Sequence, residues 1–356
     1  MPLRDNCRSR VPELVHLSDT APFSPAHGGN LAEAAALVPD PAGKWVDLST
    51  GINPFAYPLP DIPVSSWTAL PQSDDLGRIV AAARSAYSVA PEAGVVAAPG
   101  TQALIQMLPS VVKAGRRVAV VGPTYAEHAV AWQAWRHTVV SVAGPADAVA
   151  SAADVLVVVN PNNPDGRAWD GRALMAMTEA WRSNGGLLVI DEAFMDLTPD
   201  RSAASMADAP GVAILRSFGK FYGLAGVRLG FLLGPEGLTT ALDRRMGPWA
   251  VSGPALAVGA AALDDRAWAE RTRETLAGMR RRLDRLLADA GLAVIGGTDL
   301  YRLAETATAA DLHAHLARYG LWTRRFDDHP TWLRFGLCPN DEAWDRLRRA
   351  LGERAG

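Results

Sequence analysis

The sequence lacks several features that would assign a protein to a broad class at once. Its 356 residues include only two cysteines, Cys7 and Cys338, so a disulfide framework is excluded. Neither cysteine has a second Cys or a His at metal-ligand spacing, and we expect no metal site. The scarcity of cysteine fits a reducing compartment. We therefore expect a cytoplasmic protein that needs neither disulfides nor a metal.

Excess charge and long apolar runs are also missing. The 35 Lys and Arg residues nearly balance the 38 Asp and Glu residues. This balance gives no electrostatic reason to expect nucleic acid or an anionic membrane as a partner. No apolar run approaches the roughly 20 residues that span a bilayer. Residues 1–26 lack the apolar core of a signal peptide, and their prolines and mixed charges predict a poorly ordered tail.

The sequence does contain a regular alternation of short β-branched runs and helix-like segments. With 49% hydrophobic residues, the chain can bury the core of a large domain and of a smaller one. The apolar runs cover residues 95–99, 117–122, 154–160, 186–191, 212–218 and 228–234. Continuous apolar strands separated by helices predict an α/β fold with a parallel or mixed sheet, covered by helices on both faces.

The pattern changes after about residue 245. Apolar residues in 276–287 recur at three- and four-residue steps, which predicts a long amphipathic helix. Two short strand candidates and a final helix follow. We therefore expect a large domain over residues 53–245 and a smaller α/β domain over 246–356. The segment 27–52 is expected to pack on the smaller domain.

Polar groups stand out at four strand ends, and ligands bind beyond the carboxyl ends of strands in an open α/β sheet. Gly100 turns the chain onto a helix that begins near Thr101, which suits a phosphate but also describes a capped helix. Asn163, in NPNNPDG, belongs to an ordinary turn or points into a cleft. Asp191 ends an apolar strand as a helix cap, as a structural ion pair or as a ligand contact. Lys220, among small and apolar residues, is a surface lysine or a desolvated nucleophile.

Taken together, these groups match one ligand, which carries a phosphate, a ring hydroxyl, a ring nitrogen and an aldehyde. Pyridoxal 5′-phosphate needs a lysine for a Schiff base and an acidic partner for its pyridinium nitrogen. Lys220 and Asp191 would supply the two groups. The sequence therefore predicts a pyridoxal phosphate site.

The motifs around these residues resemble those of the aminotransferase class I and II family of fold type I, which depends on pyridoxal phosphate. NPNNPDG resembles the family's NPNNPTG, DEAF resembles DEAY, and SFGKFYGLAGVRLG resembles its lysine segment. WLRFGL resembles its C-terminal strand with a carboxylate-binding arginine. The resemblance runs from about residue 27 to the end of the chain. It implies a mixed, mostly parallel sheet of seven strands in the large domain and a homodimer with active sites at the subunit boundary.

The resemblance also implies a role for each matching residue. Lys220, Asp191 and Tyr125 are the expected catalytic residues: Lys220 forms the Schiff base, Asp191 pairs with the ring nitrogen, and Tyr125 stacks on the ring. Asn163 is expected to bind the ring oxygen, and Arg334 the substrate carboxylate. The residues expected to hold the cofactor phosphate are Gly100, Thr101, Gln102, Ser217 and Arg228.

Within the family, HGGNLAEAAA, WVDLSTGINPFAYPLP and GPTYAEHAVAW are similar to segments of L-threonine O-3-phosphate decarboxylases of aerobic cobalamin biosynthesis. This resemblance implies decarboxylation of a phosphorylated amino acid, with His27, Asn53 and Arg324 contacting the substrate. For His27, a structural loop histidine is the alternative. The two alternative functions are an aminotransferase of the histidinol-phosphate type and a regulatory domain that binds the cofactor without turnover. Residues 1–26 are too few for a helix-turn-helix module, which speaks against the regulatory function.

Four positions depart from the family patterns. Phe194 replaces the tyrosine of DEAY, so one donor to the ring oxygen is missing. Gly219 replaces the Ser or Thr before the lysine, so one phosphate hydroxyl is missing. Leu70 stands where histidinol-phosphate aminotransferases have a tyrosine that reaches the neighbouring subunit's phosphate. Asp165 for threonine in NPNNPDG is expected to be neutral.

Overall fold

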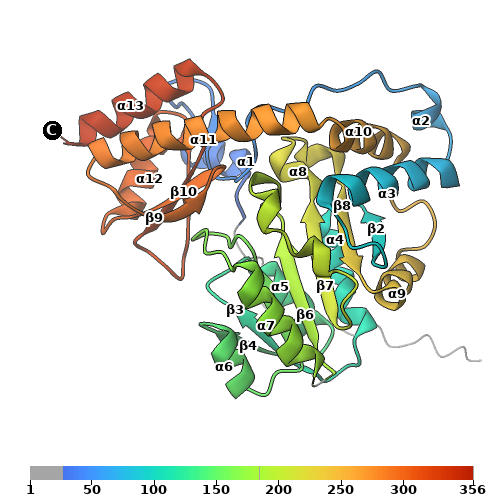
Figure 1. Ribbon diagram of the computed structural model, residues 1–356. Coiled ribbons are helices and arrows are strands. Elements are labelled where there is room, and N and C mark those ends of the chain that lie inside the picture. Colours follow the sequence, from blue (N-terminus) through green and yellow to red (C-terminus); the bar gives the residue numbers. More distant parts are fainter. Residues whose placement is uncertain (1–26, 184, 356) are drawn as a thin grey trace, which may run out of the picture.

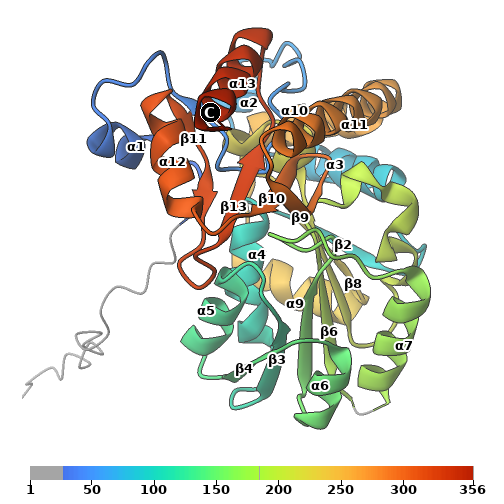
Figure 2. The ribbon, with the colours of Figure 1, turned by 90° about the vertical axis from the view of Figure 1, so that its left-hand side faces the viewer.

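A seven-stranded sheet forms the centre of the molecule in the computed structural model, which describes residues 27–183 and 185–355 (Figures 1 and 2). The strand order is β2-β8-β7-β6-β5-β3-β4, and β8 alone runs antiparallel to its neighbours. The strands are β2 (Gly94–Ala98), β3 (Arg117–Val121), β4 (Thr138–Val142), β5 (Val155–Val159), β6 (Leu187–Glu192), β7 (Val212–Ser217) and β8 (Gly230–Gly234). The predicted mixed, mostly parallel sheet is confirmed, and the predicted tail at 1–26 lies outside the described residues.

Helices cover both faces of this sheet because its central strands are apolar on both sides. All five residues of β5 are buried. Val157 packs in one apolar cluster with Leu104, and its neighbour Leu156 packs in another with Leu174. Figure 2 shows α4 and α5 on one side of the sheet and α7 on the other. The helices around the sheet are α2 (Ser65–Thr68), α3 (Ser73–Tyr87), α4 (Thr101–Met107), α5 (Glu127–Ala134), α6 (Pro145–Ala150), α7 (Gly171–Arg182), α8 (Phe218–Phe221), α9 (Glu236–Met246) and α10 (Gly253–Asp264).

Short 3-10 turns connect several of these elements. They are η1 (Leu108–Val111), η2 (Met195–Leu197), η3 (Pro199–Arg201), η4 (Ala203–Met206) and η5 (Ala225–Val227). Turns η2 to η4 follow β6, and η5 follows α8, which itself follows β7. All four turns therefore come after strands at the centre of the sheet.

A second, antiparallel sheet of four strands lies beside the first, in the order β12-β13-β10-β9. Its strands are β9 (Ala293–Thr298), β10 (Tyr301–Glu305), β12 (Arg324–Arg325) and β13 (Trp332–Gly336). The accompanying helices are α11 (Arg266–Asp289), α12 (Ala309–Arg318) and α13 (Asp341–Ala355). Figure 1 shows α11 reaching from α10 across to this small sheet. The predicted long amphipathic helix corresponds to α11.

The segment before the large sheet lies along the small one. It contains α1 (Leu31–Leu37) and β1 (Val46–Asp47), and β1 pairs in parallel with β11 (Leu321–Trp322). The Gly336 N–H donates to the Leu48 carbonyl at 2.7 Å. The predicted domain boundaries stay predictions. Helix α10 lies after the predicted boundary at 246, yet it packs on α3, since a Cβ added at Gly259 would lie 2.9 Å from Ile79.

None of the helices in the described part of the chain is long and apolar enough to cross a membrane. The same residues contain no group of three His, Cys, Asp or Glu side chains that could hold a metal ion. The cytoplasmic location stays a prediction.

Candidate active site

A cleft of about 830 Å³ opens at the carboxyl ends of the central strands. The strand register pairs Asp191 of β6 with Val159 of β5 and with Leu215 of β7, so these strands end at one level. The predicted site residues that line the cleft are His27, Gly100, Thr101, Gln102, Tyr125, Asn163, Asp191, Ser217, Lys220, Arg228, Arg324 and Arg334. Of the predicted set, only Asn53 is not part of the lining. The structure thus brings together residues that are up to 307 positions apart, from His27 to Arg334.

Asp191 is buried and oriented by two partners. His128 Nε2 lies 2.8 Å from its Oδ2, and the Ala193 N–H donates to its Oδ1 at 3.0 Å. Both His128 and Asp191 are almost fully buried. His128, in the first turn of α5, was not predicted from the sequence, because its contact with Asp191 depends on how α5 packs on the sheet. The pair keeps a carboxylate in a fixed orientation at the base of the cleft.

Lys220 is half-buried on α8, directly after the end of β7. Burial lowers the pKa of its amine to about 8, with the positive charges of Arg334 and Arg228 acting in the same direction and Asp191 opposing them. The amine therefore loses its proton much more readily near neutral pH than a surface lysine does. The alternative of a solvated surface lysine is wrong.

Asn53 lies behind the turn that carries Lys220 rather than in the cleft. Its Nδ2 donates to the Phe221 carbonyl at 2.8 Å, and its backbone N–H donates to the Lys220 carbonyl at 2.9 Å. Its Oδ1 accepts from the Phe55 N–H at 2.9 Å, and the residue is 2% exposed. The geometry does not support the substrate contact expected for Asn53, because its amide is engaged in holding the lysine turn.

The loop between β2 and α4 approaches Arg228 closely. A Cβ added at Gly100 would lie 2.5 Å from Arg228 Nη2, and Gly100 has a φ of +88°, which favours glycine. A Cβ at Gly230 would lie 2.5 Å from the Thr101 backbone nitrogen. Backbone N–H groups, a hydroxyl and a guanidinium are the donors that bind phosphate in proteins. Glycine is therefore required at position 100 by its positive φ, and the Arg228 guanidinium packs into the space that a side chain would occupy.

Arg334 of β13 is almost fully buried, and its guanidinium links the small sheet to the loops that follow β5 and β1. It donates to the Asn163 side-chain oxygen and, at 2.5 Å, to the Ser49 carbonyl. Its Nε is buried without a hydrogen-bond partner among the described residues. Burial lowers the pKa of Arg334 to about 10. A buried cation with a spare N–H is suited to bind a carboxylate.

A chain of hydrogen bonds runs along the mouth of the cleft through Glu127. This carboxylate accepts from Gln102 Nε2 at 2.7 Å and lies 2.9 Å from His27 Nε2. Gln102 in turn accepts from the Tyr125 hydroxyl at 3.1 Å. Burial raises the pKa of Tyr125 to about 12, with Glu127 and Asp191 adding to the effect. Glu127 was not predicted from the sequence, because its contact with His27 joins positions 100 residues apart.

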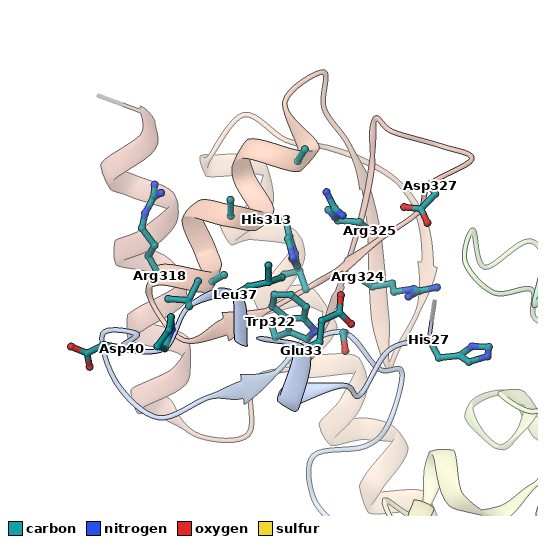
Figure 3. A pocket seen from close by; sticks show the side chains of 17 residues that line it. His27, Glu33, Leu37, Asp40, His313, Arg318, Trp322, Arg324, Arg325 and Asp327 are labelled. Carbon is teal, nitrogen blue, oxygen red and sulfur yellow. The ribbon is translucent and has the colours of Figure 1, made fainter. Parts of the chain in front are cut away.

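A second pocket of about 770 Å³ adjoins the cleft between α1 and α12 (Figure 3). Trp322 and His313 form part of its wall, and His27 and Arg324 line both pockets. Figure 3 shows the Arg324 side chain extending toward His27, away from Leu37. Arg324 therefore stands at the boundary between the cleft and the adjoining pocket.

Two departures from the family motif have a structural explanation. A Cβ added at Gly219 would lie 2.8 Å from the Ala225 Cα, so a larger residue before Lys220 would require the backbone of η5 to move. Phe194 is buried, and its ring meets that of Tyr301 edge-on with centroids 5.2 Å apart. Gly219 thus leaves room for η5, and Phe194 packs against Tyr301 of β10.

The sequence pattern of the family described as Aminotransferase class I and II matches residues 76–351. The chain belongs to this family. A threonine-phosphate decarboxylase of Pseudomonas aeruginosa is 44% identical over 91% of this chain and 96% of that protein. A second threonine-phosphate decarboxylase, from a Sinorhizobium species, is 44% identical over 91% of this chain and 97% of that protein. The histidinol-phosphate aminotransferase of Sinorhizobium meliloti, solved with pyridoxal-5′-phosphate, has a TM-score of 0.80 at 22% identity, covering 98% of each chain.

As a member of the aminotransferase class I and II family, the chain has side chains that fit pyridoxal phosphate. The cleft combines a lysine of lowered pKa, a fixed carboxylate at Asp191 and an aromatic ring at Tyr125. The space that a Cβ at Gly100 would fill is bounded by the Arg228 guanidinium, which suits the phosphate. The roles assigned to single residues stay predictions.

Proposed function

We propose that this chain is a pyridoxal phosphate-dependent carboxy-lyase. It converts L-threonine O-3-phosphate to (R)-1-amino-2-propanol phosphate and carbon dioxide in cobalamin biosynthesis. The observation that carries the proposal is the 44% identity, over nearly the whole length of both chains, with a threonine-phosphate decarboxylase. The fold likeness to a histidinol-phosphate aminotransferase, at 22% identity, supports the architecture only.

Pyridoxal phosphate supplies an aldehyde that condenses with an amine and a protonated ring that withdraws electrons from the substrate carbon. The chain's own groups prepare for this chemistry. Lys220 holds or releases a proton near neutral pH, and Asp191, oriented by His128, offers a carboxylate to a ring N–H. Tyr125 provides a flat apolar surface beside them, and its hydroxyl is anchored on Gln102.

Two arginines support a substrate with two anionic ends. Arg324 and Arg334 are directly opposed across β12 and β13, and both line the cleft. Like charges at opposed positions destabilise a sheet. Burial is the main cause of the lowered pKa of Arg334, and the positive charge of Arg324 lowers it further. A ligand that carries a carboxylate and a phosphate would offset this repulsion, with the carboxylate at Arg334 and the phosphate at Arg324.

The substrate test separates the proposal from the aminotransferase alternative. The purified protein, loaded with pyridoxal phosphate, is incubated with L-threonine O-3-phosphate in the absence of any keto acid. We expect one carbon dioxide released for each aminopropanol phosphate formed. A requirement for 2-oxoglutarate, with glutamate as product, would establish an aminotransferase instead. Retention of the cofactor without turnover of either kind would favour the regulatory function.

We also propose that the protein is a homodimer, with a second copy covering an apolar surface around α2. The exposed residues of this surface are Phe55, Leu59, Val64, Trp67, Leu70 and Trp249. A Cβ at Gly253 would lie 2.4 Å from the Ser66 carbonyl oxygen, which places the chain near Trp249 beside α2. Apolar patches of this kind are typical of protein interfaces.

Sedimentation equilibrium tests the dimer. The unchanged protein should sediment as a dimer, and Trp67→Glu should sediment as a monomer because a charge is placed within the apolar surface. Trp135→Glu is the control, since Trp135 is also exposed but lies on the other side of the sheet, after α5. A monomeric unchanged protein, or dissociation by the control alone, would refute this interface.

A further inference from the structure

A cluster of buried charges lies behind the cleft, on the side of β6 and β7 that faces α3. Arg216 Nη1 lies 2.9 Å from Glu192 Oε2, and Arg216 Nη2 lies 2.6 Å from Asp196 Oδ1. The guanidinium also lies 4.1 Å over the ring of Tyr87. All these side chains are buried, and none of them lines the cleft. None of these side chains is among the groups that act directly in the proposed reaction.

Such a cluster needs a reason beyond stability. Removing charges from water costs several kcal/mol per ion, and well-packed apolar residues are often at least as stable. Burial alone would lower the pKa of Arg216, but Asp196 and Glu192 raise it, so the guanidinium stays charged in the interior. Burial raises the pKa of Glu192, and Arg216 opposes that shift. The three side chains therefore depend on one another.

The strand geometry places this cluster directly behind the candidate cofactor residues. Glu192 and Arg216 are register partners in β6 and β7, and the preceding pair is Asp191 with Leu215. Successive side chains of a strand point to opposite faces. Asp191 therefore faces His128 of α5, while Glu192 faces Arg216. The next residue of β7 after Arg216 is Ser217, which again lines the cleft.

Further bonds connect the cluster to the other parts of the site. The Thr101 hydroxyl donates to the Arg216 carbonyl at 3.2 Å. Arg273 Nε donates to the Asp196 carbonyl at 2.7 Å, and its guanidinium lies 5.3 Å over the ring of Phe221, the residue after Lys220. The segments that carry Asp191, Thr101 and Lys220 are thus all tied to one ion cluster.

We propose that Arg216 is a positioning residue that fixes, through Glu192 and Asp196, the spacing between the Asp191 carboxylate and the Lys220 amine. This inference rests on the proposed use of pyridoxal phosphate but not on the substrate. Arginine suits the position because its planar fork meets two carboxylates at once while it stacks on an aromatic ring. Lysine carries the same charge but has no such fork.

The test compares Arg216→Lys with Arg302→Lys. Arg302 Nε is paired with Asp284 at 2.6 Å in the small sheet, outside the cleft, so its change is a matched control for loss of an arginine pair. Three properties of the cofactor-loaded proteins are measured: the melting temperature, the dissociation constant of pyridoxal phosphate, and the visible circular dichroism of the bound cofactor relative to its absorbance. The last reports how the cofactor is oriented in the site.

We expect both variants to melt at a lower temperature. Only Arg216→Lys should bind the cofactor at least tenfold more weakly and lose half or more of the visible circular dichroism signal. If Arg216→Lys loses thermal stability but keeps both cofactor properties, the role is merely structural and the proposal is wrong. These readouts do not depend on the substrate, so a failure to release carbon dioxide would overturn the proposed function without affecting this result.

Glu192→Gln provides a second route if Arg216→Lys does not fold. The amide oxygen can still accept a hydrogen bond from Arg216, but the charge is removed. We expect a loss of cofactor affinity of about threefold, with a smaller change of the dichroism in the same direction. A Glu192→Gln protein that equals the unchanged protein in both cofactor properties would overturn the proposal.

Discussion

The floor and the rim of the cleft are built in different ways. We define the floor as Asp191, His128 and Lys220, and the rim as His27 and Arg324. The floor residues lie on or next to elements of the large sheet, and their surroundings are buried. The rim residues come from the segment before α1 and from β12, and His27 is exposed. The floor can therefore fix cofactor geometry, whereas the rim is free to adapt to a substrate. Substitutions should accordingly affect chemistry at the floor and substrate binding at the rim.

The largest effect is expected from Lys220→Ala. Turnover should fall by about 10³-fold or more, because a positioned acid or base alone contributes roughly 10²–10⁴-fold. The visible absorbance of the bound cofactor should be lost as well. Lys113→Ala is the matched control, since Lys113 is exposed and lies outside the cleft. Carbon dioxide release and the visible spectrum measure the two effects. Undiminished turnover in Lys220→Ala would show that Lys220 takes no part in the reaction.

Stability of the cofactor-free protein tests the burial of Lys220. The pKa of its amine is lowered from 10.5 to about 8, so unfolding takes up a proton between these pH values. The cost to the folded state is full below pH 8 and disappears as pH rises to 10.5. Lys220→Met should raise the free energy of unfolding by up to about 3 kcal/mol at pH 7, and much less near pH 10.5. Denaturant titrations at both pH values measure the difference, and an equal gain at both would contradict the burial.

His128→Phe should act on the floor through Asp191. Loss of the imidazole leaves a buried carboxylate oxygen without its partner, which costs about 1–3 kcal/mol. We expect pyridoxal phosphate to bind about 10- to 100-fold more weakly, as measured by equilibrium dialysis. His137→Phe is the control, because His137 is also buried but its Nε2 meets the Pro109 carbonyl at 3.2 Å, outside the cleft. Equal losses in the two variants would mean that the effect is general destabilisation.

The contrast also explains what the sequence could predict. Asp191 and Lys220 follow apolar strands within recognisable motifs, and the sheet register brings such strand ends together. His128 and Arg216 were missed because their roles depend on which helix packs on which face. Asn53 was given a substrate role by its motif, but tertiary packing turned its amide toward the lysine turn. The α/β fold followed from the periodicity of apolar residues. The position of α10 beside α3 could not be predicted, because it depends on close contacts such as that of Gly259 with Ile79, which no local pattern contains.

The smallest effect is expected at the rim, from His27→Gln. If His27 contacts the substrate phosphate, the KM for L-threonine O-3-phosphate should rise about two- to fivefold, because exposed charge pairs contribute only about 0.2–1 kcal/mol. The value of kcat and the cofactor spectrum should not change. Glu127→Gln separates this role from a purely structural one, since it removes the charge next to His27 but leaves an acceptor for Gln102. If His27 acts only through Glu127, the two variants and the double variant should all have the same KM. If His27 contacts the phosphate itself, the KM of the double variant should be at least as high as that of His27→Gln. The KM of Glu127→Gln alone should then differ from the KM of both other variants.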